Sequence, residues 1–107
     1  MFAWGYTCDV EIPDFEDLNA ASQAAVKAVA AVNGVKFEAG PICETIYQAS
    51  GTTVDYMYSV LKVKYAATIE LRDTGNNGFV LPASQIIPSG KEIVAGLTTF
   101  WEYAAAH

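Results

Sequence analysis

The feature that most constrains this chain is an alternating stretch, VKYAATIEL, at residues 63–71. Successive side chains of a β-strand point to opposite sides, so a period of two is typical of a strand with one buried side. One side carries Val63, Tyr65, Ala67, Ile69 and Leu71. The other side carries Lys64, Ala66, Thr68 and Glu70. We predict a strand here.

Two shorter segments, FAWGYT at 2–7 and VKFEAG at 35–40, are also predicted to be strands. Together with the helices below, the expected order is strand, helix, strand, loop, short helix, strand, helix, which is typical of the α/β class. A chain of 107 residues suits one domain. No repeat or linker divides it, so we expect residues 1–107 to lie within a single domain.

Three segments favour helices. Asp14 or Asp17 can cap the first of them, and its inner side is formed by Leu18, Ala25, Val29 and Val32. Gly34 provides a natural helix stop. A short helix is expected from about Val54. The sequence SGKE at 89–92 matches a capping box and predicts a final helix with an inner side of Ile93, Leu97, Phe100 and Ala104.

The composition excludes several classes of protein. The chain is 52% hydrophobic and 12% aromatic, which argues against disorder. A net charge of -6 makes it a poor nucleic-acid binder, and no apolar run approaches the roughly 20 residues of a membrane span. The apolar content fits either a chain that buries surface against something larger or an alanine-rich helical domain.

Two residues suggest chemistry. Glu70 shares a side with Thr68 near the carboxyl end of the predicted strand, where ligand sites gather in α/β proteins. A solvated carboxylate paired with Arg72 or Lys64 is the simpler interpretation. Tyr47 lies in a loop and could donate a hydrogen bond to a substrate, or could simply pack on the surface.

The remaining residues offer no complete catalytic set. His107 is the only histidine, which leaves no zinc site and no Ser-His-Asp triad. Cys8 and Cys43 are either free or joined in one disulfide. The residues alone therefore predict a soluble α/β unit with one suggestive carboxylate.

Three stretches, WGYTCD, TIYQASGTTVDYMYS and KYAATIELRDTGNNGFVLPASQIIP, together resemble the carboxy-terminal part of the zinc carboxypeptidases of the A/B type. These enzymes are secreted and remove one residue from the C-terminus of a peptide. The resemblance implies part of a mixed eight-stranded sheet sandwiched by helices, with about three strands and three helices from this chain. The family binds Zn²⁺ through a His-x-x-Glu pair and a later histidine, all expected upstream of Met1.

The resemblance also implies roles for individual residues. Glu70 in ELRDTG matches the general base, which takes a proton from the zinc-bound water and delivers it to the leaving amine. Tyr47 in TIYQASG matches the tyrosine that closes over bound substrate. Val54 matches the floor of the specificity pocket and implies an apolar C-terminal residue. Further pocket and subsite positions are Ile42, Ile46, Ala49, Thr68 and Phe79.

Other matching residues are expected to be structural. The resemblance implies a disulfide between Cys8 and Cys43, which fits an extracellular setting. Arg72 is expected to form an ion pair, and Asp73 to fix the turn that follows. Thr52 departs from the family, which usually has a second glycine there, so we expect either a stiffer backbone or a slightly narrower pocket.

Two functions follow from the sequence. The first is the carboxy-terminal segment of a secreted metallocarboxypeptidase, which acts on peptide C-termini only when assembled with an upstream, zinc-binding part of the same domain. The alternative is a non-catalytic α/β module that retains the family sequence for packing or partner binding. In the first case the isolated chain should be poorly soluble or molten, because it exposes unpaired edges and an apolar face.

Overall fold

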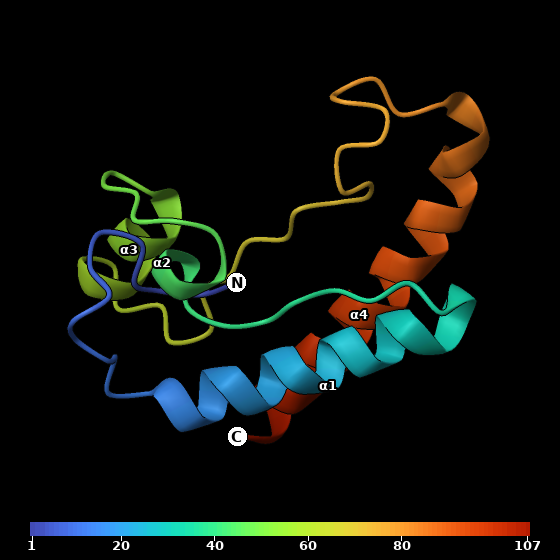
Figure 1. Cartoon of the computed structure of the whole chain (residues 1–107). Helices are drawn as coiled ribbons and strands as arrows, with labels where there is room; N and C mark the ends of the chain where they lie inside the picture. Colours follow the sequence, from blue (N-terminus) through green and yellow to red (C-terminus); the bar gives the residue numbers. More distant parts are fainter.

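Helices provide the regular structure of the chain in a computed structural model that describes residues 1–107. Along the chain these are α1 (Phe15–Asn33), α2 (Ile42–Thr45), α3 (Thr53–Ser59), the 3₁₀ helix η1 (Ala83–Gln85) and α4 (Ile86–Ala106). In Figure 1, α4 crosses behind α1, while α2, α3 and the N-terminus form a second group near the start of α1. No helix has the combined length and hydropathy of a membrane span.

The predicted α/β class is wrong for this chain, because there is no sheet. No strand forms in any of the segments predicted to be strands, at residues 2–7, 35–40 and 63–71. Only isolated bridges link them: Phe2 pairs in parallel with Pro41 and antiparallel with Ala67. The physical reason is that alternation gives a segment the side-chain pattern of a strand, but a strand forms only when neighbouring strands complete its ladder of hydrogen bonds. The chain supplies too few neighbours.

Helix α1 begins and ends close to the predicted positions. Asp14 is the N-cap residue, although its side chain makes no capping hydrogen bond and instead accepts one from the Tyr58 hydroxyl at 2.7 Å. Gly34 ends the helix with a left-handed φ of 76°, a conformation that glycine adopts without steric cost. The glycine stop is therefore confirmed, and the capping role of the aspartate is not.

Helix α3 confirms the predicted short helix near Val54 and explains Thr52. The Thr52 side chain caps this helix by accepting a hydrogen bond from the Asp55 amide at 3.2 Å. Its φ is -71°, so no glycine is required at this position. A threonine is therefore compatible with this position and serves as the N-cap of the helix.

Helix α4 starts earlier than the capping-box pattern predicts. It begins at Ile86, directly after η1, so Ser89 lies inside the helix. Both Ser89 and Glu92 are buried. The expected capping box is therefore wrong, because the Glu92 carboxylate bonds to Arg72 and Asn33 rather than to the helix start.

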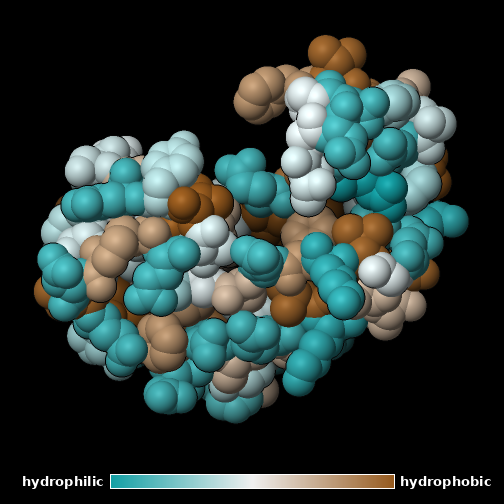
Figure 2. Space-filling view, viewed as in Figure 1, coloured by the Kyte–Doolittle hydropathy of each residue, from teal (hydrophilic) through white to brown (hydrophobic).

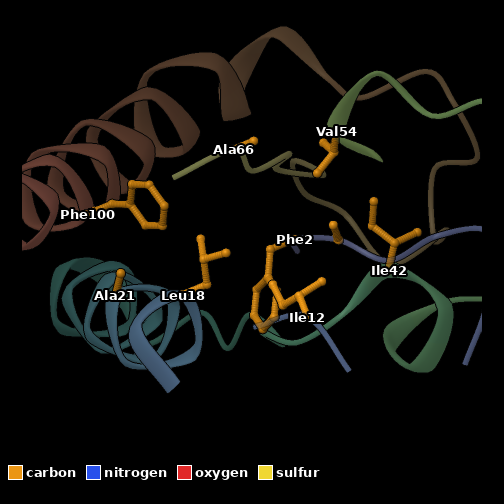
Figure 3. Packing of buried hydrophobic residues seen from close by; sticks show 9 residues of the cluster. Phe2, Ile12, Leu18, Ala21, Ile42, Val54, Ala66 and Phe100 are labelled. Atoms are coloured by element: carbon orange, nitrogen blue, oxygen red, sulfur yellow. The ribbon is translucent and has the colours of Figure 1, made fainter. Parts of the chain in front are cut away.

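The core lies where α1 meets α4 and the N-terminal residues. Figure 3 shows Phe2 and Ile12 close together, with Leu18 and Ala21 from α1 facing the space below Phe100 of α4. Phe2 and Leu18 have no exposed surface, and burying such a side chain contributes about 1.5–3 kcal/mol each. This core fixes the N-terminal segment against the helices and so defines one end of the cleft described next.

Candidate functional site

A cleft of about 710 Å³ separates the helix pair from two extended segments. Its base includes Val29 of α1 and Phe100 of α4, and its walls are residues 35–39 and 67–74. In Figure 2 the surface is hollowed between the two lobes of the molecule, with apolar side chains in the recess. Most lining side chains are hydrophobic, so the cleft combines an apolar base with a few polar groups at its edge.

Three of the predicted site residues line this cleft: Glu70, Thr68 and Ile46. The Glu70 side chain is exposed at its edge. Burial lowers the pKa of the Met1 amino group, and the negative charge of Glu70 acts in the opposite direction. The carboxylate therefore lies within electrostatic reach of the point where the chain enters the cleft.

The walls of the cleft carry unpaired backbone groups. Met1 and Thr68 exchange two hydrogen bonds, each of 2.8 Å between N and O. Beyond this pair, residues 69–71 and 35–39 make no backbone–backbone hydrogen bond. The Ala39 carbonyl accepts from Gln23 Nε2 at 3.3 Å. The backbone groups of residues 35–38 and 69–71 are therefore the free ones along the cleft, a condition that favours binding of another extended chain.

Tyr47 lies outside the cleft lining and is 68% exposed. Its loop is attached to the N-terminal segment, because the Ala49 amide donates to the Gly5 carbonyl at 2.7 Å and Gln48 Nε2 donates to the Tyr6 carbonyl at 2.6 Å. The tyrosine ring is therefore exposed on a loop whose base is held.

The predicted disulfide is present nearby. It joins Cys8 to Cys43 with a Cα–Cα distance of 5.5 Å, and Cys43 lies in the short helix α2, just before the loop of Tyr47. The bond links the N-terminal loop to α2 and so adds a second attachment at the base of the tyrosine loop.

The other predicted pocket residues are not brought to the cleft. Val54 and Ile42 are 6% and 3% exposed and belong to the hydrophobic core. Phe79 is fully exposed in the loop before η1. Their substrate-binding roles remain predictions, and within this chain Val54 and Ile42 contribute to packing.

Arg72 forms the predicted ion pair, and its partner is Glu92, a residue that the sequence pattern missed. Hydrogen bonds from Arg72, and a further one from Asn33 Nδ2 at 2.9 Å, hold the pKa of the Glu92 carboxyl below its usual range. Glu92 lies one turn before Gly96 and two before Phe100, both of them buried. That helical spacing is the signal that could have identified Glu92 as a buried carboxylate.

Asp73 fixes the turn after Glu70, as predicted. Its carboxylate accepts from the Gly75 amide at 2.7 Å and from Asn77 Nδ2 at 2.5 Å. These hydrogen bonds lower the pKa of Asp73, and the one from the Asn77 side chain has the largest effect. The turn is therefore built around a charged carboxylate at neutral pH.

The sequence of this chain matches a known protein family. The family model for zinc carboxypeptidases matches residues 1–96, and the chain belongs to the zinc carboxypeptidase family. Carboxypeptidase A1 of Homo sapiens is 49% identical over 107 residues, which is all of this chain and 25% of the relative. Metallocarboxypeptidase A of Trichophyton rubrum is 51% identical over 96 residues, which is 90% of this chain and 23% of the relative.

A solved structure is also similar. Bovine thrombin-activatable fibrinolysis inhibitor, in complex with tick carboxypeptidase inhibitor, matches with a TM-score of 0.91 and 30% identity, covering 99% of this chain and 36% of that chain. The chain spans about a quarter of the length of the curated relatives named above. Within it, no group of three or more His, Cys, Asp or Glu side chains could hold a metal ion.

Proposed function

We propose that this chain is the carboxy-terminal part of the catalytic domain of an A-type zinc carboxypeptidase, with no domain boundary between residues 1 and 107. The assembled enzyme would hydrolyse the last peptide bond of substrates with an apolar or aromatic C-terminal residue. The similar proteins named above, which are carboxypeptidases A by name, support the assignment. This chain covers only about a quarter of each of them.

The observation that carries the proposal is the cleft itself. Its apolar base and the free backbone groups of residues 69–71 and 35–38 form a surface suited to an extended segment. Met1 lies at one end and already pairs with Thr68. The occupant we infer is the upstream part of the same domain, which would thereby be placed beside Glu70.

Glu70 serves as the general base in this proposal. A carboxylate within hydrogen-bond reach of the attacking water can accept its proton and return it to the leaving amine. Glu70 has the exposure for this role and lies at the edge of the cleft. The residues of this chain do not fit a zinc site, so the metal of the family belongs to the upstream part.

Specificity follows from the residues around the tyrosine loop. Val54, Ile42, Ile46 and Ala49 are apolar, and none of them could pair with a basic side chain. In this proposal Tyr47, which is exposed on its held loop, closes over a bound peptide. The disulfide between Cys8 and Cys43 favours secretion, because such bonds persist in oxidising compartments.

A chimera tests the proposal. The matching quarter of human carboxypeptidase A1 is replaced by this chain, and release of C-terminal Phe and Lys from two otherwise identical peptides is measured. We expect release of Phe well above release of Lys, and a loss of at least about 1,000-fold in kcat for Glu70→Gln, with an unchanged melting temperature. An inactive but folded chimera, or an active Glu70→Gln variant, would show that the assignment is wrong.

A further inference from the structure

Glu92 is the most completely buried charged side chain of the protein, with no exposed surface. Both of its carboxylate oxygens are used. Oε2 accepts from Arg72 Nε at 3.2 Å, and Oε1 accepts from Arg72 Nη2 and from Asn33 Nδ2. The Arg72 guanidinium also donates from Nη1 to Gln85 Oε1 at 3.1 Å. Arg72 is thus held by a fork of two hydrogen bonds to one carboxylate and by a third to the helix start.

The segment that carries Glu70 has few other attachments. Thr68 is paired with Met1 on one side, and residues 69–71 have no backbone–backbone hydrogen bond. The next attachment along the chain is the Arg72 side chain. Glu70 therefore lies midway between two attachments, one made by the backbone and one made by Glu92.

We propose that Glu92 is a positioning residue for Glu70, acting through Arg72. The proposal rests on the function proposed above. A paired guanidinium and carboxylate lie in one plane and are held by two hydrogen bonds. The fork therefore fixes both the orientation of the Arg72 guanidinium and its distance from α4. Glu70 and Arg72 both line the cleft, so the fork transmits the position of the helix to the proton-accepting carboxylate two residues away.

A second ion pair on the same segment supplies a control. Lys64 Nζ lies 2.5 Å from Asp17 Oδ2, but the two side chains are 36% and 39% exposed. This pair precedes the Met1–Thr68 attachment and is separated from Glu70 by it. Asp17→Asn and Glu92→Gln are the same chemical change in the two pairs, and only Glu92→Gln should affect the position of Glu70.

The kinetic test uses the chimera with human carboxypeptidase A1, with rates expressed per active enzyme. A misplacement of about 1 Å costs about 100-fold in rate, so we expect Glu92→Gln to lower kcat by about 10- to 100-fold with KM within about twofold. Arg72→Lys keeps the positive charge but cannot form the fork, and it should lower kcat similarly. Asp17→Asn should leave both constants within about twofold. Equal kcat values in all four proteins would overturn the proposal.

A spectroscopic test does not depend on activity. Arg72 is the only arginine of this chain, so its Nε–H gives a single cross-peak in the spectrum of a chimera in which only the 107-residue segment carries ¹⁵N. We expect slow exchange of this proton with water, a loss of that protection in Glu92→Gln, and no change in Asp17→Asn. A rapidly exchanging Nε–H in the folded, unsubstituted chimera contradicts the fork. A protected Nε–H in an inactive chimera would show that the fork exists and that the proposed catalytic function is wrong.

Discussion

The charge of Glu92 makes the stability of the protein depend on pH. Hydrogen bonds from Arg72 lower the pKa of this carboxyl in the folded state, so the unfolded state binds a proton more readily. The stabilisation is complete above the unfolded pKa of about 4.3 and is lost as the pH falls through the lower, folded pKa. We expect Glu92→Gln to reduce the free energy of unfolding of the chimera by about 3 kcal/mol at neutral pH, and much less in acid.

Urea unfolding of both proteins at about pH 7 and about pH 3 measures this difference. Asp17 and Asp73 also have lowered pKa values, but both are present in each protein, so their contributions cancel in the comparison. A difference that stays constant between the two pH values would mean that the pKa of Glu92 is the same in the folded and unfolded states, against the lowered pKa on which the prediction rests.

Residues whose partners lie nearby in the sequence could be predicted. Asp73 bonds to Gly75 and Asn77 within one turn. The resemblance carried the pairing of Cys8 with Cys43, while the role that it implies for Glu70 stays a prediction. Glu92 could not be predicted in the same way, because its partners Arg72 and Asn33 lie 20 and 59 residues away. A carboxylate next to SGK fits a helix cap by local pattern, and only the tertiary contacts show that it is buried.

The α1–α4 pair depends on a glycine at the crossing point. A Cβ at Gly96 would lie 2.7 Å from Val29 Cγ2, whereas one at Gly90, in the same helix, would meet nothing within 4 Å. We expect Gly96→Ala to destabilise the chimera by about 1–3 kcal/mol and Gly90→Ala to stabilise it by about 0.5–1 kcal/mol. Thermal melts of the two variants give the comparison, and a stabilised Gly96→Ala would show that the helices can separate without cost.

The helices could be predicted from the sequence but the strands could not, because a helix forms its hydrogen bonds within one segment and a strand forms them with other segments. Helix α1 closes its bonds within residues 15–33, so capping and periodicity suffice to define it. The alternation over residues 63–71 is as regular, but its hydrogen-bond partners must come from other segments. The bridges of Phe2 with Pro41 and Ala67 are all that this chain provides.

The whole molecule carries an apolar cleft along which residues 35–38 and 69–71 make no backbone–backbone hydrogen bond. Apolar side chains next to free backbone groups form a surface that associates readily with another chain. Leu71 is 54% exposed and lines this cleft. Val10 is 57% exposed but lies in the loop before α1 and outside the cleft lining, so the two residues separate the effect of the cleft from that of exposed apolar area in general.

We therefore expect the isolated 107-residue chain to be helical by circular dichroism, to bind a hydrophobic dye and to self-associate at micromolar concentration. Leu71→Lys should shift it toward the monomer, since a charge on an unpaired edge opposes pairing with a second copy, whereas Val10→Lys should not. Sedimentation velocity at two or more concentrations measures the distribution. A monomeric chain with a sharp cooperative melt would mean that the cleft needs no occupant, and the inferred assembly with an upstream part would lose its main support.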